Sequence, residues 1–170
     1  MRKLTLVITA LFALNVTSFA QTYFIVNSEQ IFKSLSAYTK AIETLDELEG
    51  TYQDNIDKAY QTIEEQYNTY KQQAAYLSDA ERTAKENQII ENEKKITEYT
   101  ETTLGDNGEL MKKRIELIQP IQDKVFTVIN NYATTNNISM VIDVATTPSV
   151  VYYNPSLDKT NAIIELLKAQ

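Results

Sequence analysis

Tyrosine is the residue type in this sequence whose chemistry calls for an explanation. Four tyrosines lie between Ala59 and Asp79, a stretch that has one isoleucine, one leucine and neither glycine nor proline. The pattern predicts a helix with too little aliphatic bulk for an ordinary globular core. Each tyrosine combines a wide apolar ring with a hydroxyl that tolerates water. These rings are therefore candidates for non-covalent contacts.

Residues suited to a chemical reaction are scarce. The chain has no histidine and no cysteine, which removes the usual general base, the commonest metal ligand and the thiol nucleophile. The acidic pairs Glu64–Glu65 and Glu91 with Glu93 are typical of a solvated helix face. The sequence has no glycine-rich phosphate loop, metal-ligand spacing or nucleophile–base pair. We expect no enzyme activity, no metal and no cofactor.

The first 20 residues have the features of a secretory signal peptide. Two basic residues precede the apolar run Leu4–Leu14, and Ser18–Ala20 forms a small-x-small cleavage site. The run is too short to span a bilayer. We predict cleavage after Ala20 and export across the inner membrane. A lipid anchor on a mature N-terminal cysteine is excluded, because the chain has none.

The overall charge narrows the range of partners. The net charge is −7, and removal of the two basic residues of the signal makes the mature chain still more acidic. An acidic chain argues against nucleic-acid binding and weakens the case for anionic membrane surfaces. Three glycines and three prolines are few, which predicts long regular elements.

A heptad pattern runs through the first half of the mature chain. Apolar residues recur at steps of 3, 4 and 7 over about six heptads. The predicted seam consists of Leu35, Tyr38, Ile42, Leu45, Tyr52, Ile56, Ile63, Tyr70 and Leu77. Charged or polar residues occupy three further seam positions, Glu49, Gln66 and Gln73.

The seam is predicted to fold back as a helical hairpin. Ser78 followed by Glu81 is a capping box, so the first helix should end near Leu77 and the tip should lie near 75–79. Gly105–Gly108 should interrupt the returning helix, and Pro120 should bend its last part or lie near the start of its last segment. The arm is expected to span 37–132.

The two ends of the mature chain are predicted to form a small body at 21–36 and 133–170. It should contain strands 22–27, 138–144 and 150–154 and a C-terminal helix, 157–168. Asp143 is expected to hold backbone or tyrosine hydroxyl groups at a strand end. The fold class is mainly α with a small β body. Three short strands and one helix cannot cover a core alone, which predicts an oligomer.

Five segments, in order, give the chain a family resemblance: "YFIVNSEQIF", "AAYLSD", "IQPIQDKVFTVINNYA", "NNISMVIDV" and "VVYYNPSLDKTNAIIELLK". Together they resemble the Skp/OmpH family of periplasmic outer-membrane-protein chaperones. The resemblance implies a periplasmic, jellyfish-like homotrimer, with a compact α+β trimerisation body and three helical-hairpin arms around a cavity. Unfolded outer-membrane β-barrel proteins would be held there without ATP or cofactor.

On this resemblance, side chains that flank the seam become candidates for binding an unfolded client through many weak contacts. They are Leu48, Tyr60, Tyr67, Tyr76, Ile90 and Tyr99. The seam tyrosines Tyr52 and Tyr70 are expected to pack against the returning helix. The alternative is that the flanking rings only widen a helix–helix contact. The candidates for the oligomerisation body are Phe24, Val26, Val141, Ile142, Val151, Tyr153, Ile164 and Leu167.

The acidic charge is a departure from the basic arms of well-known members of that family. It argues against a lipopolysaccharide or membrane site. The basic residues concentrated on the arm are Lys94, Lys95, Lys112, Lys113 and Arg114, which form either a lipid-phosphate patch or a solvated helix face. Two rival functions stay open: a scaffolding coiled-coil protein of the envelope that binds a dedicated partner, and a carrier of lipid or lipopolysaccharide.

Overall fold

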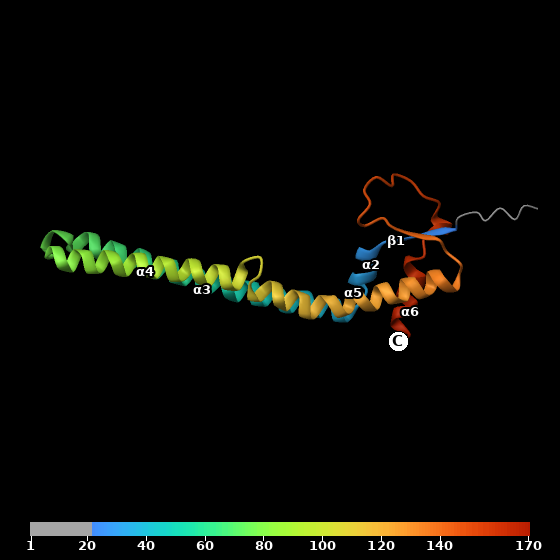
Figure 1. The fold of residues 1–170 in the computed structure, drawn as a ribbon, viewed down its shortest axis with the longest axis horizontal. Coiled ribbons are helices and arrows are strands. Elements are labelled where there is room, and N and C mark those ends of the chain that lie inside the picture. Colours follow the sequence, from blue (N-terminus) through green and yellow to red (C-terminus); the bar gives the residue numbers. More distant parts are fainter. Residues whose placement is uncertain (1–21) are drawn as a thin grey trace, which may run out of the picture. The chain divides into compact units, whose positions relative to one another are not determined.

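The computed structural model describes residues 22–170, and the predicted signal peptide lies outside them. The described chain divides into two compact units (Figure 1). Residues 31–127 form one, which we call the arm unit. Residues 22–30 and 128–170 belong to the other, which we call the body unit.

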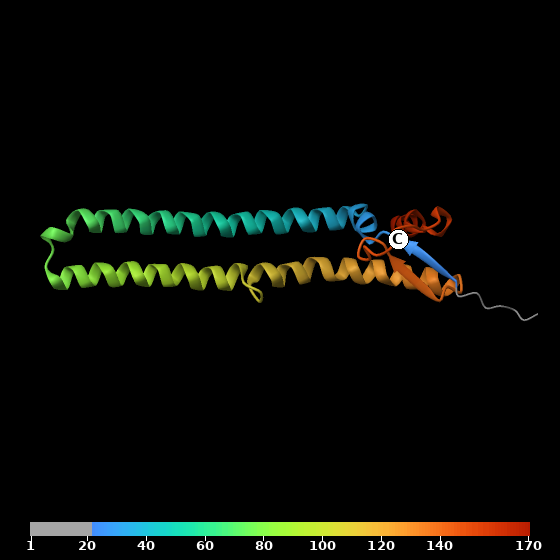
Figure 2. The same ribbon diagram turned by 90° about the horizontal axis from the view of Figure 1, so that it is seen from above.

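The arm unit is built from long helices. Helix α3 (Ser36–Gln73) leads to the 3₁₀ helix η1 (Ala74–Tyr76), and α4 (Asp79–Leu104) returns alongside α3 as an antiparallel hairpin (Figures 1 and 2). The short helix α2 (Ser28–Lys33) precedes α3, and α5 (Glu109–Thr135) follows α4. The 38 residues of α3 extend for about 57 Å at 1.5 Å per residue.

The turn of the hairpin is fixed by the predicted capping box. The Ser78 hydroxyl accepts a hydrogen bond from the Glu81 backbone N–H at 3.4 Å. The Glu81 carboxylate accepts in return from the Ser78 N–H at 2.9 Å. Both bonds satisfy backbone donors that the first turn of α4 would otherwise leave unpaired. The predicted position of the tip is therefore confirmed by local hydrogen bonding.

The predicted heptad seam faces the returning helix. Leu45, Ile56 and Ile63 are buried, and the other six predicted apolar positions are half-buried. Ile56 and Ile63 form the core of the hairpin with Ile96 of α4. The polar seam residue Gln66 is also satisfied, because its side-chain oxygen accepts a hydrogen bond from the Asn92 amide at 3.0 Å.

The Gly105–Gly108 segment interrupts the return leg as predicted. Helix α4 ends at Leu104 and α5 begins at Glu109, and the loop between them projects from the line of the two helices (Figure 2). A Cβ atom at Gly108 would lie 2.7 Å from the Thr103 carbonyl oxygen, so a larger residue would displace the loop. Helix α5 continues through Pro120.

A two-stranded parallel sheet organises the body unit. Strand β1 (Tyr23–Val26) pairs with β2 (Met140–Asp143) in the register Tyr23 to Met140 and Val26 to Asp143. The Val144 N–H bonds to the Val26 carbonyl oxygen at 2.9 Å and extends the ladder by one step. Parallel strands need a long crossover, and here the helices between the two strands supply it.

The core of the body unit lies around β1. Phe24, Ile25 and Val26 are buried, as are Ile163 and Leu167 of the C-terminal helix α6 (Thr160–Lys168). The Phe24 ring packs edge-on against Tyr132 with ring centroids 5.3 Å apart. The end of α5 is followed by Asn137, whose φ of 54° is a left-handed conformation that asparagine tolerates.

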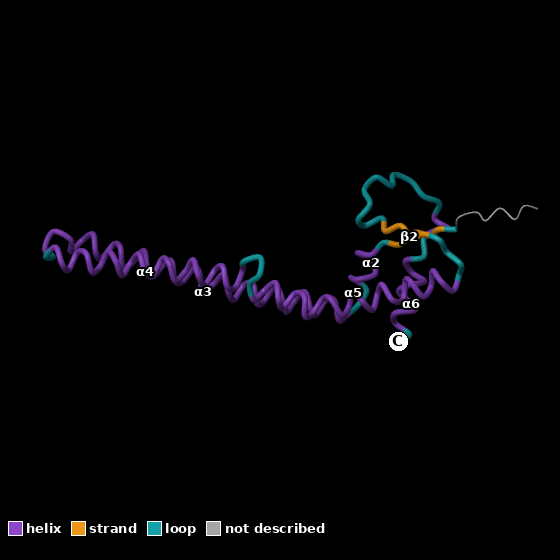
Figure 3. Tube along the Cα trace, viewed as in Figure 1, coloured by secondary structure: helices purple, strands orange, loops and turns teal. Residues whose placement is uncertain are grey.

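The prediction of a third strand at 150–154 is wrong. These residues form a loop, shown in teal in Figure 3, and Val151 is 95% exposed. On the edge of β1 that faces away from β2, Ile25 forms an isolated β-bridge with Asp158. In this bridge the Lys159 N–H donates to the Ile25 carbonyl oxygen at 2.9 Å. Strand-type residues without a neighbouring ladder form no strand within one protomer.

The C-terminal helix begins later than the predicted residue 157. Pro155–Leu157 forms the short 3₁₀ helix η2, whose start is held by the Asn154 side chain accepting from the Ser156 N–H at 3.0 Å. The Asp158 carboxylate then accepts from the Thr160 N–H at 2.8 Å. Two successive side-chain turns therefore delay the helix to Thr160.

Asp143 joins the end of β2 to the start of α2. Its carboxylate accepts hydrogen bonds from the Ser28 N–H at 3.0 Å, the Ser28 hydroxyl at 2.6 Å, the Ala145 N–H at 3.0 Å and the Thr146 hydroxyl at 3.2 Å. Partial burial alone would raise the pKa of Asp143, but these hydrogen bonds outweigh it and the net shift is downward. The partners are serine and threonine rather than the tyrosines considered from the sequence.

Because the folded-state pKa of Asp143 is lowered, the bonds to its carboxylate stabilise the body above the unfolded pKa of about 4. That contribution is lost as the pH falls through the folded value. We expect Asp143→Asn to lower the free energy of unfolding by about 2 kcal/mol at pH 7 and by much less near pH 2. Urea titrations at both pH values measure this difference. An equal loss of unfolding free energy at pH 7 and pH 2 would show that the ionised Asp143 carboxylate does not stabilise the body.

Candidate functional site

The seam tyrosines use their hydroxyls to bind the return leg of the arm. The Tyr52 hydroxyl donates to the Glu109 carboxylate at 2.8 Å, and the Tyr70 hydroxyl donates to Glu86. The hydrogen bond to the carboxylate is the main cause that raises the pKa of each tyrosine. The expectation that these two rings pack against the returning helix is confirmed.

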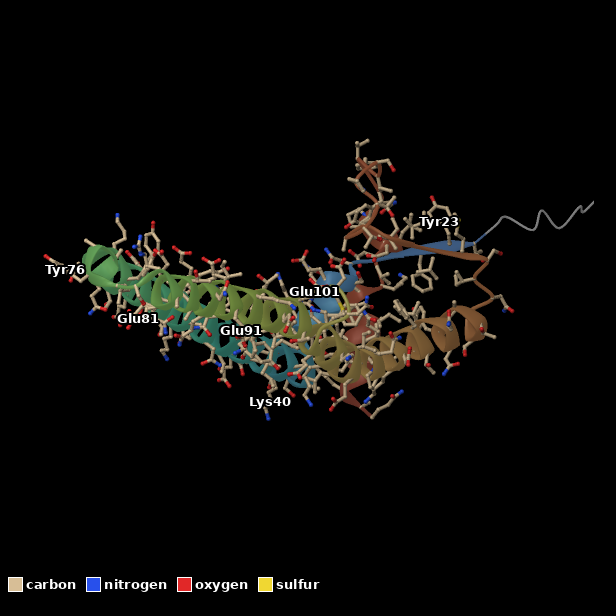
Figure 4. The ribbon with its side chains drawn as sticks, turned by 60° about the vertical axis from the view of Figure 1, so that its left-hand side comes forward. Tyr23, Lys40, Tyr76, Glu81, Glu91 and Glu101 are labelled. Atoms are coloured by element: carbon tan, nitrogen blue, oxygen red, sulfur yellow. The ribbon has the colours of Figure 1, made fainter. Side chains whose placement is uncertain are left out.

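The flanking tyrosines differ from the seam tyrosines. Tyr60 and Tyr67 of α3 are 52% and 48% exposed, and Tyr76 at the tip is 90% exposed (Figure 4). Their hydroxyls form no hydrogen bond with any residue from 22 to 170. The Lys71 ammonium lies 5.7 Å from the centre of the Tyr67 ring. These three rings are available for contacts outside the chain.

The other three candidates for client binding fall into different environments. Ile90 of α4 is 61% exposed, and Leu48 is half-buried. Tyr99 is half-buried and packs against the hairpin core, with its ring edge-on to Tyr52 at 6.2 Å. Its hydroxyl accepts from the Asn55 amide at 3.2 Å. Tyr99 therefore resembles the seam tyrosines more than the free ones.

The arm also contains a furrow that sequence reasoning missed. A hollow of about 400 Å³ is lined by residues of both helices, including Ile56, Ala59, Ile96 and Tyr99. A second hollow of about 310 Å³ adjoins it and shares Ala59 and Ile96. We call the two together the arm furrow. Its apolar floor is open to solvent along the hairpin.

The cause of the furrow can be read from the heptad. Ala59 lies three residues after Ile56 and four before Ile63, so it occupies a seam position that a large side chain would fill. A methyl group there leaves space between α3 and α4. The signal was present in the sequence, as a small residue at a seam position.

We expect Ala59→Leu to fill the furrow and raise the free energy of unfolding by about 1 kcal/mol, because the added carbons become partly buried. Urea denaturation followed by circular dichroism measures it. Ala84→Leu, on an exposed face of α4, is the matched control and should have little effect. Equal stabilisation by the two substitutions would show that filling the furrow is not responsible; helix propensity does not favour either substitution, because alanine is the stronger helix former.

Most of the predicted basic patch is neutralised by neighbouring glutamates. Lys94 lies 3.6 Å from Glu98, Lys95 lies 2.8 Å from Glu91, and Lys113 lies 2.7 Å from Glu116. Within the described chain, Lys112 and Arg114 form no ion pair. A phosphate group would find little net positive charge along these helices, and a lipid-phosphate site stays an untested prediction.

The predicted oligomerisation residues divide between core and surface. Phe24, Val26 and Leu167 are buried within the protomer. Val141, Ile142 and Ile164 are half-buried, and so is Tyr153, whose hydroxyl donates to Asp158 at 3.3 Å. Burial is the main cause that raises the pKa of Tyr153.

Val151 is the residue of that predicted set that lies fully at the surface. Four further large apolar side chains of the body unit, outside that predicted set, are exposed: Tyr23 at 42%, Met140 at 53%, Tyr152 at 81% and Leu166 at 43%.

Over residues 22–170, no cluster of histidine, cysteine, aspartate or glutamate could hold a metal ion. None of the helices within that range has the length and apolar character needed to cross a membrane.

Comparison with known proteins gives the family. No curated protein matches the chain. A solved structure from Caulobacter crescentus CB15, described as a candidate outer membrane chaperone of the OmpH-like type, shares the fold with a TM-score of 0.68. The two chains are 12% identical, and the match covers 86% of this chain and 83% of the other. The family model described as "Outer membrane protein (OmpH-like)" matches residues 22–167. The chain therefore belongs to the OmpH-like family.

Proposed function

We propose that this protein is an ATP-independent holdase chaperone of the periplasm. It binds unfolded outer-membrane β-barrel proteins between the helical arms of a homotrimer and prevents their aggregation. Family membership and the chaperone description of the Caulobacter structure support this proposal.

The observation that carries the proposal is the contrast between the two sets of tyrosines. Tyr52 and Tyr70 bond to glutamates of the return leg, whereas Tyr60, Tyr67 and Tyr76 leave their rings exposed. Exposed aromatic rings on an arm that also has an apolar furrow can hold many different apolar segments weakly. The acidic charge of the chain keeps such arms soluble and limits their association with one another.

The homotrimer is part of the same proposal. Met140, Val151 and Tyr152 place large apolar side chains at the surface of the body unit. Large apolar side chains exposed on a small body are candidates for contact with another copy.

The test is suppression of aggregation. An unfolded outer-membrane β-barrel protein is diluted from urea in the presence of the mature protein without ATP, and light scattering is followed. The proposal predicts suppression near one trimer per client. A scaffolding protein with a dedicated partner would leave the scattering unchanged, and a lipid carrier would instead retain lipid through purification.

A further inference from the structure

A second groove lies on the arm unit. The arm furrow is lined by Lys95, which is paired with Glu91, whereas the cation at the second groove, Arg114, forms no ion pair with the described residues. The second groove has a volume of about 280 Å³ and is lined by side chains of α2, α3 and α5. Phe32 and Tyr38 form an aromatic wall, with ring centroids 5.4 Å apart and planes tilted by 33°. Ile115, which is 57% exposed, contributes to the apolar lining.

Arg114 gives this groove its charge. It lines the groove and forms no ion pair or hydrogen bond with the described residues. In contrast, Lys94, Lys95 and Lys113 of the same arm are each paired with a glutamate. An unpaired guanidinium beside aromatic and aliphatic side chains is an unusual feature in a chain whose net charge is −7.

Two glutamine side chains complete the polar part of the groove. The Gln119 side-chain amide donates a hydrogen bond to the Asp123 carboxylate at 2.8 Å. This carboxylate is therefore already bonded within the chain. The Gln122 amide forms no hydrogen bond with any residue from 22 onwards and can both donate and accept. A groove that combines apolar side chains with a few unsatisfied polar groups is typical of a ligand site.

The chemistry of the groove selects its occupant. A guanidinium binds a carboxylate through two parallel hydrogen bonds, and the aromatic wall suits an apolar side chain. In an extended chain, adjacent side chains point to opposite faces. The nearest side chain on the same face as an internal acidic residue is therefore two residues along, about 7 Å away, which is far for one small groove. At a chain terminus, the carboxylate belongs to the last residue itself, so both groups can enter one small groove.

We infer that this groove binds the C-terminal residue of an unfolded chain, with its carboxylate on Arg114 and an aromatic or large aliphatic side chain against Phe32 and Tyr38. The inference rests on the proposed holdase function and adds one directed contact to the weak, undirected contacts of the flanking tyrosines. A client held at its C-terminus keeps the rest of its chain free to move.

The test uses short labelled peptides and the full mature protein. A six-residue glycine–serine peptide that ends in phenylalanine is prepared with a free C-terminal carboxylate and with a C-terminal amide. A third peptide has an amide end and an internal glutamate. At low salt we expect the free acid to bind on the order of fivefold more tightly than either amide, measured by fluorescence anisotropy.

Three variants separate charge from apolar contact. Arg114→Gln should abolish the difference between acid and amide, whereas Lys112→Gln, a neighbouring unpaired cation outside the groove, should retain it. Ile115→Ser should weaken both peptides by a similar factor. Absence of binding, equal binding of acid and amide, or loss of the difference in Lys112→Gln would overturn the inference.

The aggregation assay keeps the two proposals apart. Arg114→Gln should still suppress aggregation, because the exposed tyrosines and the furrow are unchanged. Suppression without any preference for the free acid would retain the holdase and reject the groove. A preference for the free acid without suppression would reject the holdase.

Discussion

Replacing Val151 by aspartate is expected to dissociate the oligomer while each protomer stays folded. Val151 is 95% exposed and lies in a loop without regular structure, so the substitution removes no contact inside the protomer. In the proposed trimer the same residue lies against another copy, where an unpaired carboxylate costs several kcal/mol. The dissociation constant of the trimer should rise by roughly a hundredfold or more.

Analytical ultracentrifugation measures the mass, and circular dichroism checks the fold. Val151→Thr has nearly the same shape without a charge and should remain assembled. A trimer of Val151→Asp with unchanged stability would show that the loop is outside the interface. Aspartate at Val141 or Ile142 is expected to dissociate the trimer as well, but these residues are half-buried in β2 and their loss would also disturb the protomer.

Changing Tyr60, Tyr67 and Tyr76 together to serine should weaken client binding by at least about tenfold. An aromatic contact contributes about 1 kcal/mol, and three lost contacts are only partly additive. The stability and mass of the protein should hardly change, because none of the three hydroxyls forms a hydrogen bond within the described chain. Titration of a labelled, urea-unfolded β-barrel protein measures the affinity.

Phenylalanine at the same three positions is the matched control, because it keeps the rings and removes only the hydroxyls. This variant should bind the client as well as the natural sequence does. Serine at the seam residues Tyr52 and Tyr70 should act differently and lower stability, since it breaks bonds to Glu109 and Glu86. Unchanged client affinity in the triple serine variant would remove these tyrosines from the binding surface.

The arm could be predicted from sequence because its signals are local. Ser78 and Glu81 are three residues apart and make their capping bonds to each other. The interruption at Gly105–Gly108 also depends on residues close in sequence. The heptad spacing identified the buried seam, because a period of 3.5 residues places its members on one helix face.

The sequence was a weaker guide where structure depends on distant partners. Residues 150–154 have strand composition, yet a strand needs a neighbour, and Asp158 occupies the free side of β1. Tyr99 looks like the flanking tyrosines in sequence, but its contacts with Asn55 and Tyr52 place it in the seam. The groove beside Arg114 joins side chains about 80 positions apart, and no local pattern reveals it.

The most direct test of the holdase is the mass of its complex with a client. Mature protein is mixed with an unfolded outer-membrane β-barrel protein without nucleotide, and the soluble fraction is measured by size-exclusion chromatography with light scattering. We expect a single soluble species that contains one trimer and one client. Precipitation of the client, with the protein eluting alone at its own mass, would contradict the proposed function.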